Sequence, residues 1–417
     1  MSTVHDVADR AARPQFVHAR FTPRSVRTST HMVNRPECEA YAGAVATPEQ
    51  LNPTPKSSGS GCLLWLGLAL LVPATGQVLG WLSQGLSGFS AALGLGLGLL
   101  ALGCCGRSLG IGAASRLLGA GAALVLAPWL WRAVSVKGSE RVRLTTLPDD
   151  GGARLVNKLY PERDGTLLAA KLLGFVRPLH DDEAAHFPQI LEDAFARTDP
   201  PASDVPTPAI ATYLGLESAT QFDALVISPP PGRAASDAAL IFLHGYAGNF
   251  YIYCWEIAQA AAAANLITIC PSTDASGRWW MPGGEQVFQQ TLDYAHRSGM
   301  NRVYLAGLSN GGAGASELAL SHARELSGLV LISGSRAQRP PPLPTLVIQG
   351  ATDRMMPTAT ARTYAAASPR AEYHELPGGH LIMLSRYQQV RPLIANFLLK
   401  LEQGAPGSPL YSSERKR

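Results

Sequence analysis

The sequence lacks several features that would indicate particular functions. Its net charge is only +4 and it contains no continuous basic stripe, so nothing supports nucleic-acid binding. Its six cysteines include no Cys-x-x-Cys pair and no Cys/His spacing typical of a zinc site. Neither Cys254 nor Cys270, the two in the C-terminal half, requires a disulfide, so the redox compartment stays open. We therefore expect no metal, no cofactor and no nucleic-acid partner.

Charge is almost missing from residues 62–131, where the charged residues are Arg107 and Arg116. Each of the three apolar runs in this stretch has about the ~20 residues that a helix needs to cross a bilayer. The runs cover 62–82, 86–106 and 109–131. We predict about three transmembrane helices, and hence a multi-pass membrane protein in contact with the lipid bilayer. A buried helical hairpin in a soluble protein is the alternative, and Arg116 leaves open a third helix that lies on the membrane surface.

Two further features of this apolar region concern its packing and its orientation. Gly94 and Gly98 form a small-xxx-small pair, which favours close approach of a neighbouring helix. Basic residues are more frequent in the 15 residues after the third run than in the 15 before the first. They are Arg132, Lys137, Arg141 and Arg143 after it, against Lys56 before it. The positive-inside tendency thus places the C-terminal half in the cytoplasm, although Arg24, Arg27 and Arg35 reduce the bias.

The remaining chain divides into two tails and one domain. Residues 1–61 are rich in Arg, Ser, Thr and Pro without apolar periodicity, and we predict a disordered tail. Residues 403–417 are predicted to form a flexible C-terminal tail. Between them, over 140–402, short apolar strands alternate with helices, most clearly in the core from 220 onward. This alternation predicts an α/β domain with a mostly parallel sheet and helices on both faces.

A serine lies at the one point of this domain where a strand leads directly into a glycine-rich helix. Gly307-Leu308-Ser309-Asn310-Gly311 follows the apolar strand 303–306 and opens a helix. Such a turn presents the serine hydroxyl above the sheet, and the flanking glycines avoid side-chain clashes. The amides at the start of the helix then face any oxyanion that develops. Ser309 is therefore the candidate nucleophile.

The candidate base and acid follow from the chain order Ser, acid, His that goes with this turn. His380 lies in a glycine-rich turn between the last strand and the last helix, whereas His322 and His374 lie within a helix and a strand. Asp353 follows the apolar strand 346–348, where a carboxylate orients an imidazole. Glu317 and Glu375 are the alternative acids.

Other residues near this serine are candidates for binding. The apolar strand 239–243 ends in His244-Gly245-Tyr246, and we expect the backbone amides of Tyr246 and Asn310 to form an oxyanion hole, with His244 packed. Trp279 and Trp280, after the strand 266–270, are candidates for walls of a substrate pocket, together with Leu308. Adjacent tryptophans are more often core packing.

These motifs together resemble the α/β-hydrolase superfamily, in particular its carboxylesterase and dienelactone-hydrolase-like branches. The resemblance covers 220–402 and implies an α/β-hydrolase fold with Ser309, Asp353 and His380 as a catalytic triad. Two departures stand out. Residues 333–344 are too few for the lid that many relatives insert there, so the site is open unless 153–220 covers it. The apolar region is absent from most such esterases.

The sequence thus predicts a membrane-anchored serine hydrolase that cleaves carboxylic esters through an acyl-enzyme, with a small ester or acyl compound as substrate. A peptidase, thioesterase or acyltransferase on the same triad is an alternative, and a non-catalytic membrane scaffold is another. A transporter is excluded, because three short-looped spans with one interior charge offer no path for a substrate.

Overall fold

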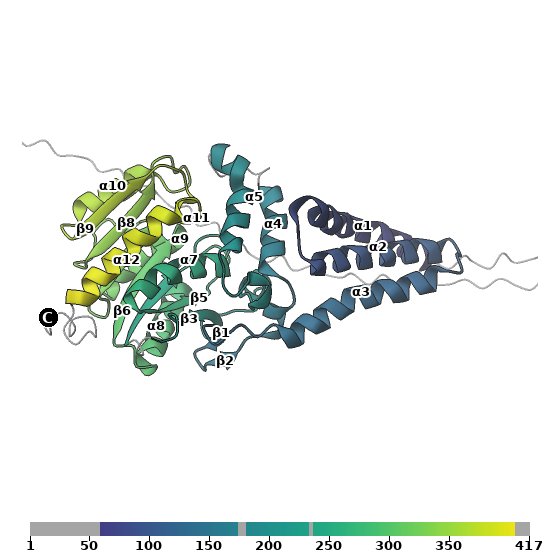
Figure 1. Cartoon of the computed structure of the whole chain (residues 1–417), viewed down its shortest axis with the longest axis horizontal. Coiled ribbons are helices and arrows are strands. Elements are labelled where there is room, and N and C mark those ends of the chain that lie inside the picture. The colour runs from purple at the N-terminus through teal and green to yellow at the C-terminus, as the bar shows by residue number, and fades with distance from the viewer. Residues whose placement is uncertain (1–58, 174–180, 233–236, 405–417) are drawn as a thin grey trace, which may run out of the picture. The chain divides into compact units, whose positions relative to one another are not determined.

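The computed structural model describes residues 59–173, 181–232 and 237–404 (Figure 1). Nearly all of the two predicted tails, 1–61 and 403–417, lies outside the described residues. Three long helices come first: α1 (Gly59–Gln84), α2 (Gly88–Ser108) and α3 (Ala114–Ser135). Each is long and apolar enough to cross a membrane. Pro73 lies within α1 without ending it.

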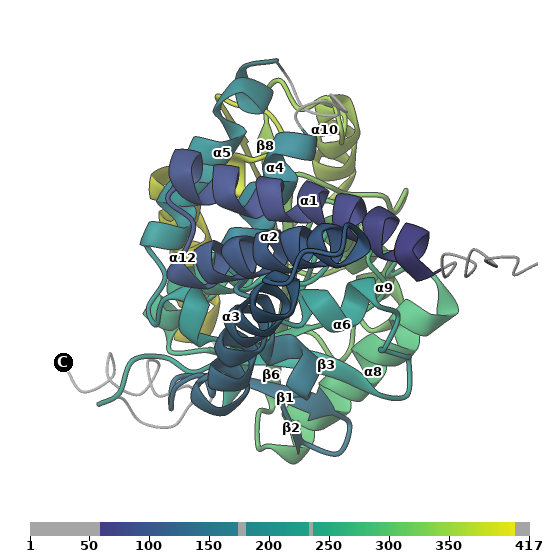
Figure 2. The same cartoon turned by 90° about the vertical axis from the view of Figure 1, so that its right-hand side faces the viewer.

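Helix α2 lies between α1 and α3 (Figure 2). Large apolar side chains on the outer helices are more than seven-tenths exposed, among them Trp65, Val72, Trp131 and Val134. A continuous apolar surface of this size is unusual on a protein surrounded by water. The exposure is therefore consistent with a lipid environment for these helices.

The predicted glycine pair is half right. A side chain at Gly94 would collide with Gln77 and Val78 of α1, so this glycine does allow the close approach of α1 and α2. Nothing lies within 4 Å of the position that a side chain at Gly98 would take, so the prediction for Gly98 is wrong. Gly96 and Gly121 provide the close contact between α2 and α3 instead, because each faces the backbone of the other. A spacing of four residues identifies one face of a helix, and α2 packs on two faces.

A nine-stranded sheet follows, in the order β2-β1-β3-β5-β4-β6-β7-β8-β9. The pairs from β5 to β9 are parallel, whereas β1, β2 and β3 pair antiparallel. The strands are β1 (Val142–Leu147), β2 (Gly151–Gly152), β3 (Phe222–Ile227), β4 (Ala238–Leu243), β5 (Ile267–Pro271), β6 (Arg302–Leu308), β7 (Gly328–Ile332), β8 (Thr345–Gly350) and β9 (Ala371–Leu376). The predicted fold class, an α/β-hydrolase fold preceded by apolar helices, is confirmed.

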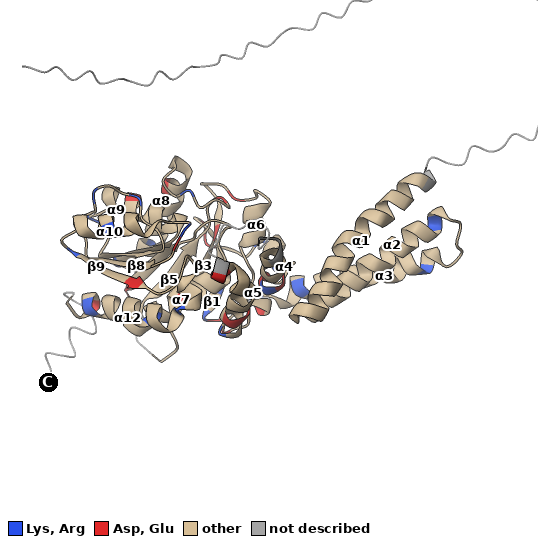
Figure 3. Ribbon diagram, turned by 90° about the horizontal axis from the view of Figure 1, so that it is seen from above, with Lys and Arg blue, Asp and Glu red and all other residues tan. Residues whose placement is uncertain are grey.

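Helices cover both faces of the sheet, because its strands bury both sets of alternating side chains (Figure 3). In β4, Leu240 and Phe242 lie on the side of the sheet that α7 and α12 cover, while Ile241 and Leu243 lie on the side of α8, α9 and α10. The helices are α4 (Glu162–Leu173), α5 (Asp181–Ala196), α6 (Ala209–Tyr213), α7 (Tyr251–Ala261), α8 (Pro282–Arg297), α9 (Asn310–Ser321), α10 (Thr358–Ala367), α11 (Ile382–Ser385) and α12 (Tyr387–Gly404), with short 3-10 turns at Leu155–Lys158, Ala202–Asp204 and Ala262–Ala264.

The segment 153–220, the least clear part of the sequence, supplies α4, α5 and α6. The sequence over 181–197 allows a helix, and α5 forms there, whereas α4 was not predicted. The carboxylate of Asp164 in α4 accepts hydrogen bonds from the hydroxyl groups of Ser87 and Ser90 at 2.5 Å each. This segment is thereby tied to the start of α2.

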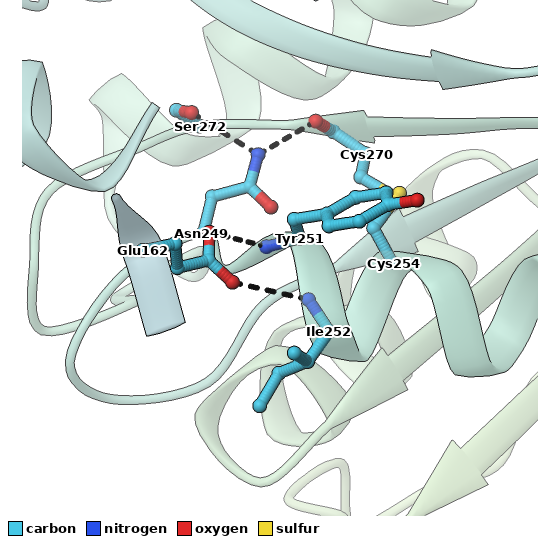
Figure 4. The surroundings of a disulfide bond; sticks show 7 residues. All are labelled: Glu162, Asn249, Tyr251, Ile252, Cys254, Cys270 and Ser272. Carbon is cyan, nitrogen blue, oxygen red and sulfur yellow. Dashed lines mark hydrogen bonds between the residues drawn. A yellow bond between two sulfur atoms is a disulfide. The ribbon is translucent and has the colours of Figure 1, made fainter. Parts of the chain in front are cut away.

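A disulfide joins Cys254 in α7 to Cys270 in β5 (Figure 4). Beside it, the side-chain amide of Asn249 donates to the carbonyl of Cys270 at 2.7 Å and to the hydroxyl of Ser272 at 3.2 Å. The bond fixes α7 to the sheet next to the loop that follows β4. It also bears on the compartment, because disulfides persist where the environment is oxidising.

Candidate active site

Ser309 occupies the turn between β6 and α9, with φ 56° and ψ −121°. This left-handed conformation is costly for a residue with a side chain, and such strain is typical of functional turns. It is possible here because glycines make room: a side chain at Gly307 would collide with Gly311, and one at Gly311 with the backbone of Leu243 and His244. The serine is held at the carboxyl end of β6 by a hydrogen bond from its amide to the carbonyl of Ile332 at 2.9 Å.

The structure brings Ser309, His380 and Asp353 together in one hydrogen-bonded chain. The Oγ of Ser309 lies 2.9 Å from Nε2 of His380, and the Nδ1 of His380 lies 2.9 Å from Oδ2 of Asp353. The three residues are 6 %, 8 % and 6 % exposed for Ser309, His380 and Asp353. A buried imidazole in this position can take a proton from the serine while the carboxylate stabilises the cation that forms.

The Asp353 carboxylate is held by additional donors. Its Oδ1 accepts the backbone amides of Met355 and Met356, and its Oδ2 also accepts the side-chain amide of Gln349, all at 2.9 Å. The orientation of the carboxylate toward His380 is therefore fixed from three sides. Gln349, at the end of β8, was missed by the sequence reasoning, because a glutamine at a strand end carries no motif.

The alternative acids and bases lie elsewhere. Glu375 pairs with Arg362 at 2.6 Å, and the arginine and an adjacent tyrosine hold the pKa of Glu375 below its usual range. His322 and His374 pair with exposed glutamates, namely Glu325 and Glu372. Glu317 faces Arg336 at 3.7 Å. In the described part of the chain, no hydrogen bond or ion pair joins any of these groups to Ser309 or His380.

The loop after β4 lies directly against Ser309. A side chain at Gly245 would come within 3.0 Å of the Cβ of Ser309, so glycine allows this approach without displacing the serine. The next residue, Tyr246, exposes 67 % of its surface. Within the described residues, the backbone N–H groups of Tyr246 and Asn310 donate to no backbone carbonyl. Two free donors beside a serine hydroxyl are what an oxyanion hole requires.

His244 anchors this loop from below. Its Nε2 accepts the amide of Thr273 at 3.1 Å, so its Nδ1 carries the proton and donates to the carbonyl of Gly245 at 2.8 Å. Burial lowers the pKa of His244 to about 4, which keeps the ring neutral. The structure thus has His244 as a packed, hydrogen-bonded histidine.

The three residues predicted to line a pocket lie in different surroundings. Trp279 is fully buried under α9, and its indole N–H donates to the carbonyl of His244 at 2.9 Å. A side chain without exposed surface offers no wall to a ligand, so Trp279 packs the core. Trp280 stacks against Arg336, whose guanidinium lies 4.5 Å from the ring centre. Leu308 is 7 % exposed and belongs to the core beneath the serine.

A carboxylate from outside the core, Glu183 of α5, also reaches this site. It accepts hydrogen bonds from three successive backbone amides, those of Gly379, His380 and Leu381. Sequence reasoning missed Glu183, because a glutamate in the first turn of a helix is ordinarily explained by the helix itself. Among the described residues, no group of three or more His, Cys, Asp or Glu side chains has the arrangement of a metal site.

Comparisons with known proteins give a short sequence match and many structural ones. No family model matches the chain. A poly(3-hydroxyalkanoate) depolymerase from Ectopseudomonas oleovorans is 36% identical over 70 residues, which is 17% of this chain and 25% of the depolymerase. The chain therefore matches only a quarter of the length of that relative.

Solved structures with a similar arrangement include Est1E and XC6422. Est1E from Butyrivibrio proteoclasticus shares 14% identity over 43% of this chain and 94% of its own, with a TM-score of 0.38. XC6422 from Xanthomonas campestris, described as a serine hydrolase without a lid, shares 17% identity over 46% of this chain and 93% of its own, with a TM-score of 0.37.

Proposed function

We propose that this chain, which has the α/β-hydrolase fold, is a membrane-anchored serine hydrolase that cleaves carboxylic esters through an acyl-enzyme. The observation that carries the proposal is the hydrogen-bonded chain from Ser309 through His380 to Asp353 on a strained turn. Structural packing does not require a serine in a left-handed conformation with its hydroxyl on an imidazole. The nucleophile turn of this fold combines both, because the turn exposes the hydroxyl and the imidazole activates it.

The proposed reaction has two halves. The Oγ of Ser309 attacks the ester carbonyl and its proton passes to Nε2 of His380, while the amides of Tyr246 and Asn310 hold the oxyanion. Collapse of this intermediate breaks the bond to the alcohol, which leaves with the proton from His380. Water, deprotonated by His380, then attacks the acyl-enzyme, and the acid is released as His380 returns this proton to the Oγ of Ser309. Throughout, Asp353 holds the Nδ1 proton of the imidazole.

The test is hydrolysis of p-nitrophenyl esters of varied acyl length by the full chain in detergent. Ser309→Ala is expected to lower kcat by roughly 10⁶, the loss typical when a triad nucleophile is removed. Activity on thioesters or peptides in place of esters would redirect the assignment to a thioesterase or peptidase, and transfer to added alcohols to an acyltransferase. A folded chain that is inactive on all of them would be a scaffold.

The partial match to the depolymerase gives limited support for an ester substrate, because its name refers to a polyester. We accordingly propose a small ester or acyl compound as substrate, with no cofactor. We further propose a membrane region over 62–131 and a hydrolase domain over 140–402, with tails at 1–61 and 403–417. The exposed apolar surface of α1, α2 and α3 supports the membrane region.

Two observations disagree about the side on which the hydrolase domain lies. The count of basic residues around the apolar region predicted that the hydrolase domain lies in the cytoplasm. The disulfide between Cys254 and Cys270 instead favours an oxidising compartment. Basic residues occur at both ends of the helices (Figure 3), since Arg107 and Arg116 flank the connection between α2 and α3. Because this weakens the charge bias, we propose the oxidising side.

A pair of reporter fusions at the C-terminus tests the orientation. Alkaline phosphatase, which needs its own disulfides, is expected to be active there, and green fluorescent protein exported in an unfolded state is expected to be dark. A bright fluorescent fusion with an inactive phosphatase fusion would place the domain in the cytoplasm.

A further inference from the structure

The loop that carries His380 has two halves with different anchors. In the first half, the amide and hydroxyl of Thr352 both donate to the carbonyl of Gly378 at 3.0 Å. The side chain of Arg386 donates to the carbonyl of Pro377 at 2.8 Å. These contacts come from the core itself. They fix the carbonyl groups ahead of the histidine and leave the amides of the following residues without a partner in the core.

Glu183 holds the second half. Its Oε1 accepts the amides of Gly379 at 3.1 Å and Leu381 at 3.0 Å, and its Oε2 accepts the amide of His380 at 2.8 Å. The carboxylate is buried, as are these three donors. Hydrogen bonds to a charged acceptor are stronger than those between neutral groups, and a buried amide without an acceptor is costly. The backbone of the histidine itself therefore depends on one side chain of α5.

The glycine before the histidine fits this arrangement. A side chain at Gly379 would collide with the carboxylate of Glu183, so the loop and the glutamate are in close contact along the backbone. Such a contact leaves no room for a bridging water. It transmits any displacement of Glu183 directly to the backbone that carries the imidazole.

We propose that Glu183 is a positioning residue, which sets the distance between His380 and Ser309 from the segment 153–220. This inference rests on the proposed function, since positioning is meaningful only if His380 acts as the base. Glu183 touches neither the serine nor the imidazole ring. It acts through the three backbone amides and keeps Nε2 at 2.9 Å from the serine Oγ.

The geometry also gives the segment 153–220 a defined role. The same segment is bonded through Asp164 to Ser87 and Ser90 at the start of α2. The helices α4 and α5 thus contact both the apolar helices and the loop of the proposed base. In the proposed role the segment is a support that the base requires to reach the nucleophile.

The test compares Glu183→Gln with Asp193→Asn, the same acid-to-amide change at an exposed position of α5. The glutamine keeps the size of the side chain but replaces one acceptor oxygen with a donor, so it cannot accept all three amides. With a p-nitrophenyl ester and the full chain in detergent, we expect kcat to fall by about 10- to 100-fold and KM to stay within about twofold. Asp193→Asn is expected to keep the wild-type values.

Rates are normalised to the sites that a fluorophosphonate titrates, so that misfolded molecules do not count. A kcat per titrated site equal to that of Asp193→Asn would overturn the proposal, as would a loss confined to KM. If Glu183→Gln yields no titratable sites, Glu183→Asp, which keeps the charge but withdraws it, is expected to show the same fall in kcat at constant KM. A Glu183→Asp variant without this fall in kcat would also overturn the proposal. A wild-type chain without ester hydrolysis or labelling would instead contradict the proposed function.

Discussion

The core, 222–402, and the segment before it, 153–220, are specified by the sequence in different ways. Strands β3, β4 and β8 are buried at every position, and their apolar side chains pack on both faces of the sheet. The segment has shorter and more polar helices, and its decisive contacts are made by carboxylates. Glu162 and Glu183 each accept backbone amides from the core.

This difference separates two kinds of structural information. Apolar periodicity determines which residues are buried, and it repeats along the chain, so it is visible in the sequence. A carboxylate that accepts amides from a distant loop is a single residue without periodicity. The core thus forms the sheet that carries Ser309 at the carboxyl end of β6, and the segment fixes loops around that serine.

The largest expected effect concerns the core alone. Asp353→Asn keeps the shape of the side chain but removes the charge that stabilises the imidazolium of His380. We expect kcat to fall by roughly 10⁴. The free energy of unfolding should fall as well, because the amide nitrogen of asparagine cannot accept from the donors that hold the carboxylate. Steady-state kinetics with a p-nitrophenyl ester and thermal unfolding in the same detergent measure both. Near-normal turnover would show that another residue is the acid.

The next effect tests the contact between segment and core at Glu162. This carboxylate accepts the amides of Tyr251 at 2.8 Å and Ile252 at 3.2 Å, where α7 begins (Figure 4). Glu162→Ala leaves both amides and the hydroxyl of Thr207 without this acceptor. We expect a loss of about 4 kcal/mol in the free energy of unfolding, from roughly 1–3 kcal/mol for each buried unpaired group.

The pH dependence of that loss follows from the pKa of Glu162, which burial raises to about 7. A raised carboxyl pKa means that its contribution is full below about 4.5 and decreases as the pH rises through 7. The loss in Glu162→Ala should therefore be larger at pH 5 than at pH 8. Denaturant unfolding at the two pH values, with Asp193→Ala as control, checks this. A loss that grows with pH would contradict it.

A third effect concerns a buried polar group within the core. Burial lowers the pKa of His244 from 6.5 to about 4. Between these pH values its imidazole therefore stays neutral in the folded chain and takes up a proton in the unfolded chain. The stability from this group is complete above about pH 6.5 and is lost as the pH falls toward 4. The difference corresponds to roughly 3 kcal/mol.

The variant His244→Gln separates this group from the other titrating residues. Its free energy of unfolding should decrease less between pH 7 and pH 4 than that of the wild type, since glutamine does not titrate. Denaturant titrations at several pH values give the slope of the free energy of unfolding against pH for the variant and for the wild type. Parallel slopes would show that His244 does not contribute to the acid sensitivity.

The smallest effect compares two glycines of α2. Gly94→Leu places a side chain against Gln77 and Val78 of α1, whereas Gly98→Leu projects into open space. Overpacking of this kind costs about 2 kcal/mol. We expect a lower thermal midpoint for Gly94→Leu in detergent and no decrease for Gly98→Leu. Equal midpoints would mean that α1 and α2 do not pack as described.

Much of the core was predictable because its signals are local. The apolar run that forms β4, the turn at Ser309 and the glycine-rich loop before His380 each predict their own structure, and the order of the residues predicts that they meet. The segment was less predictable. Helix α4 has mixed polarity, and Glu183 becomes informative only when the loop 379–381 is beside it in space.

The disulfide and the tryptophans show the same limit. Cys254 lies on a helix and Cys270 on a strand, so no short spacing marks their pairing. Trp279 and Trp280 are adjacent in sequence, but one is fully buried and the other is partly exposed beside Arg336. Which side of the chain meets the core depends on the turn after β5, and this turn has no periodic pattern.

The central claim is that Ser309 is an activated nucleophile, and covalent labelling tests it most directly. The full chain in detergent is treated with a fluorophosphonate, digested and analysed by mass spectrometry. The account predicts a single adduct on Ser309 that is absent in Ser309→Ala and strongly reduced in His380→Ala. A folded wild-type chain that carries no adduct on Ser309 would contradict it.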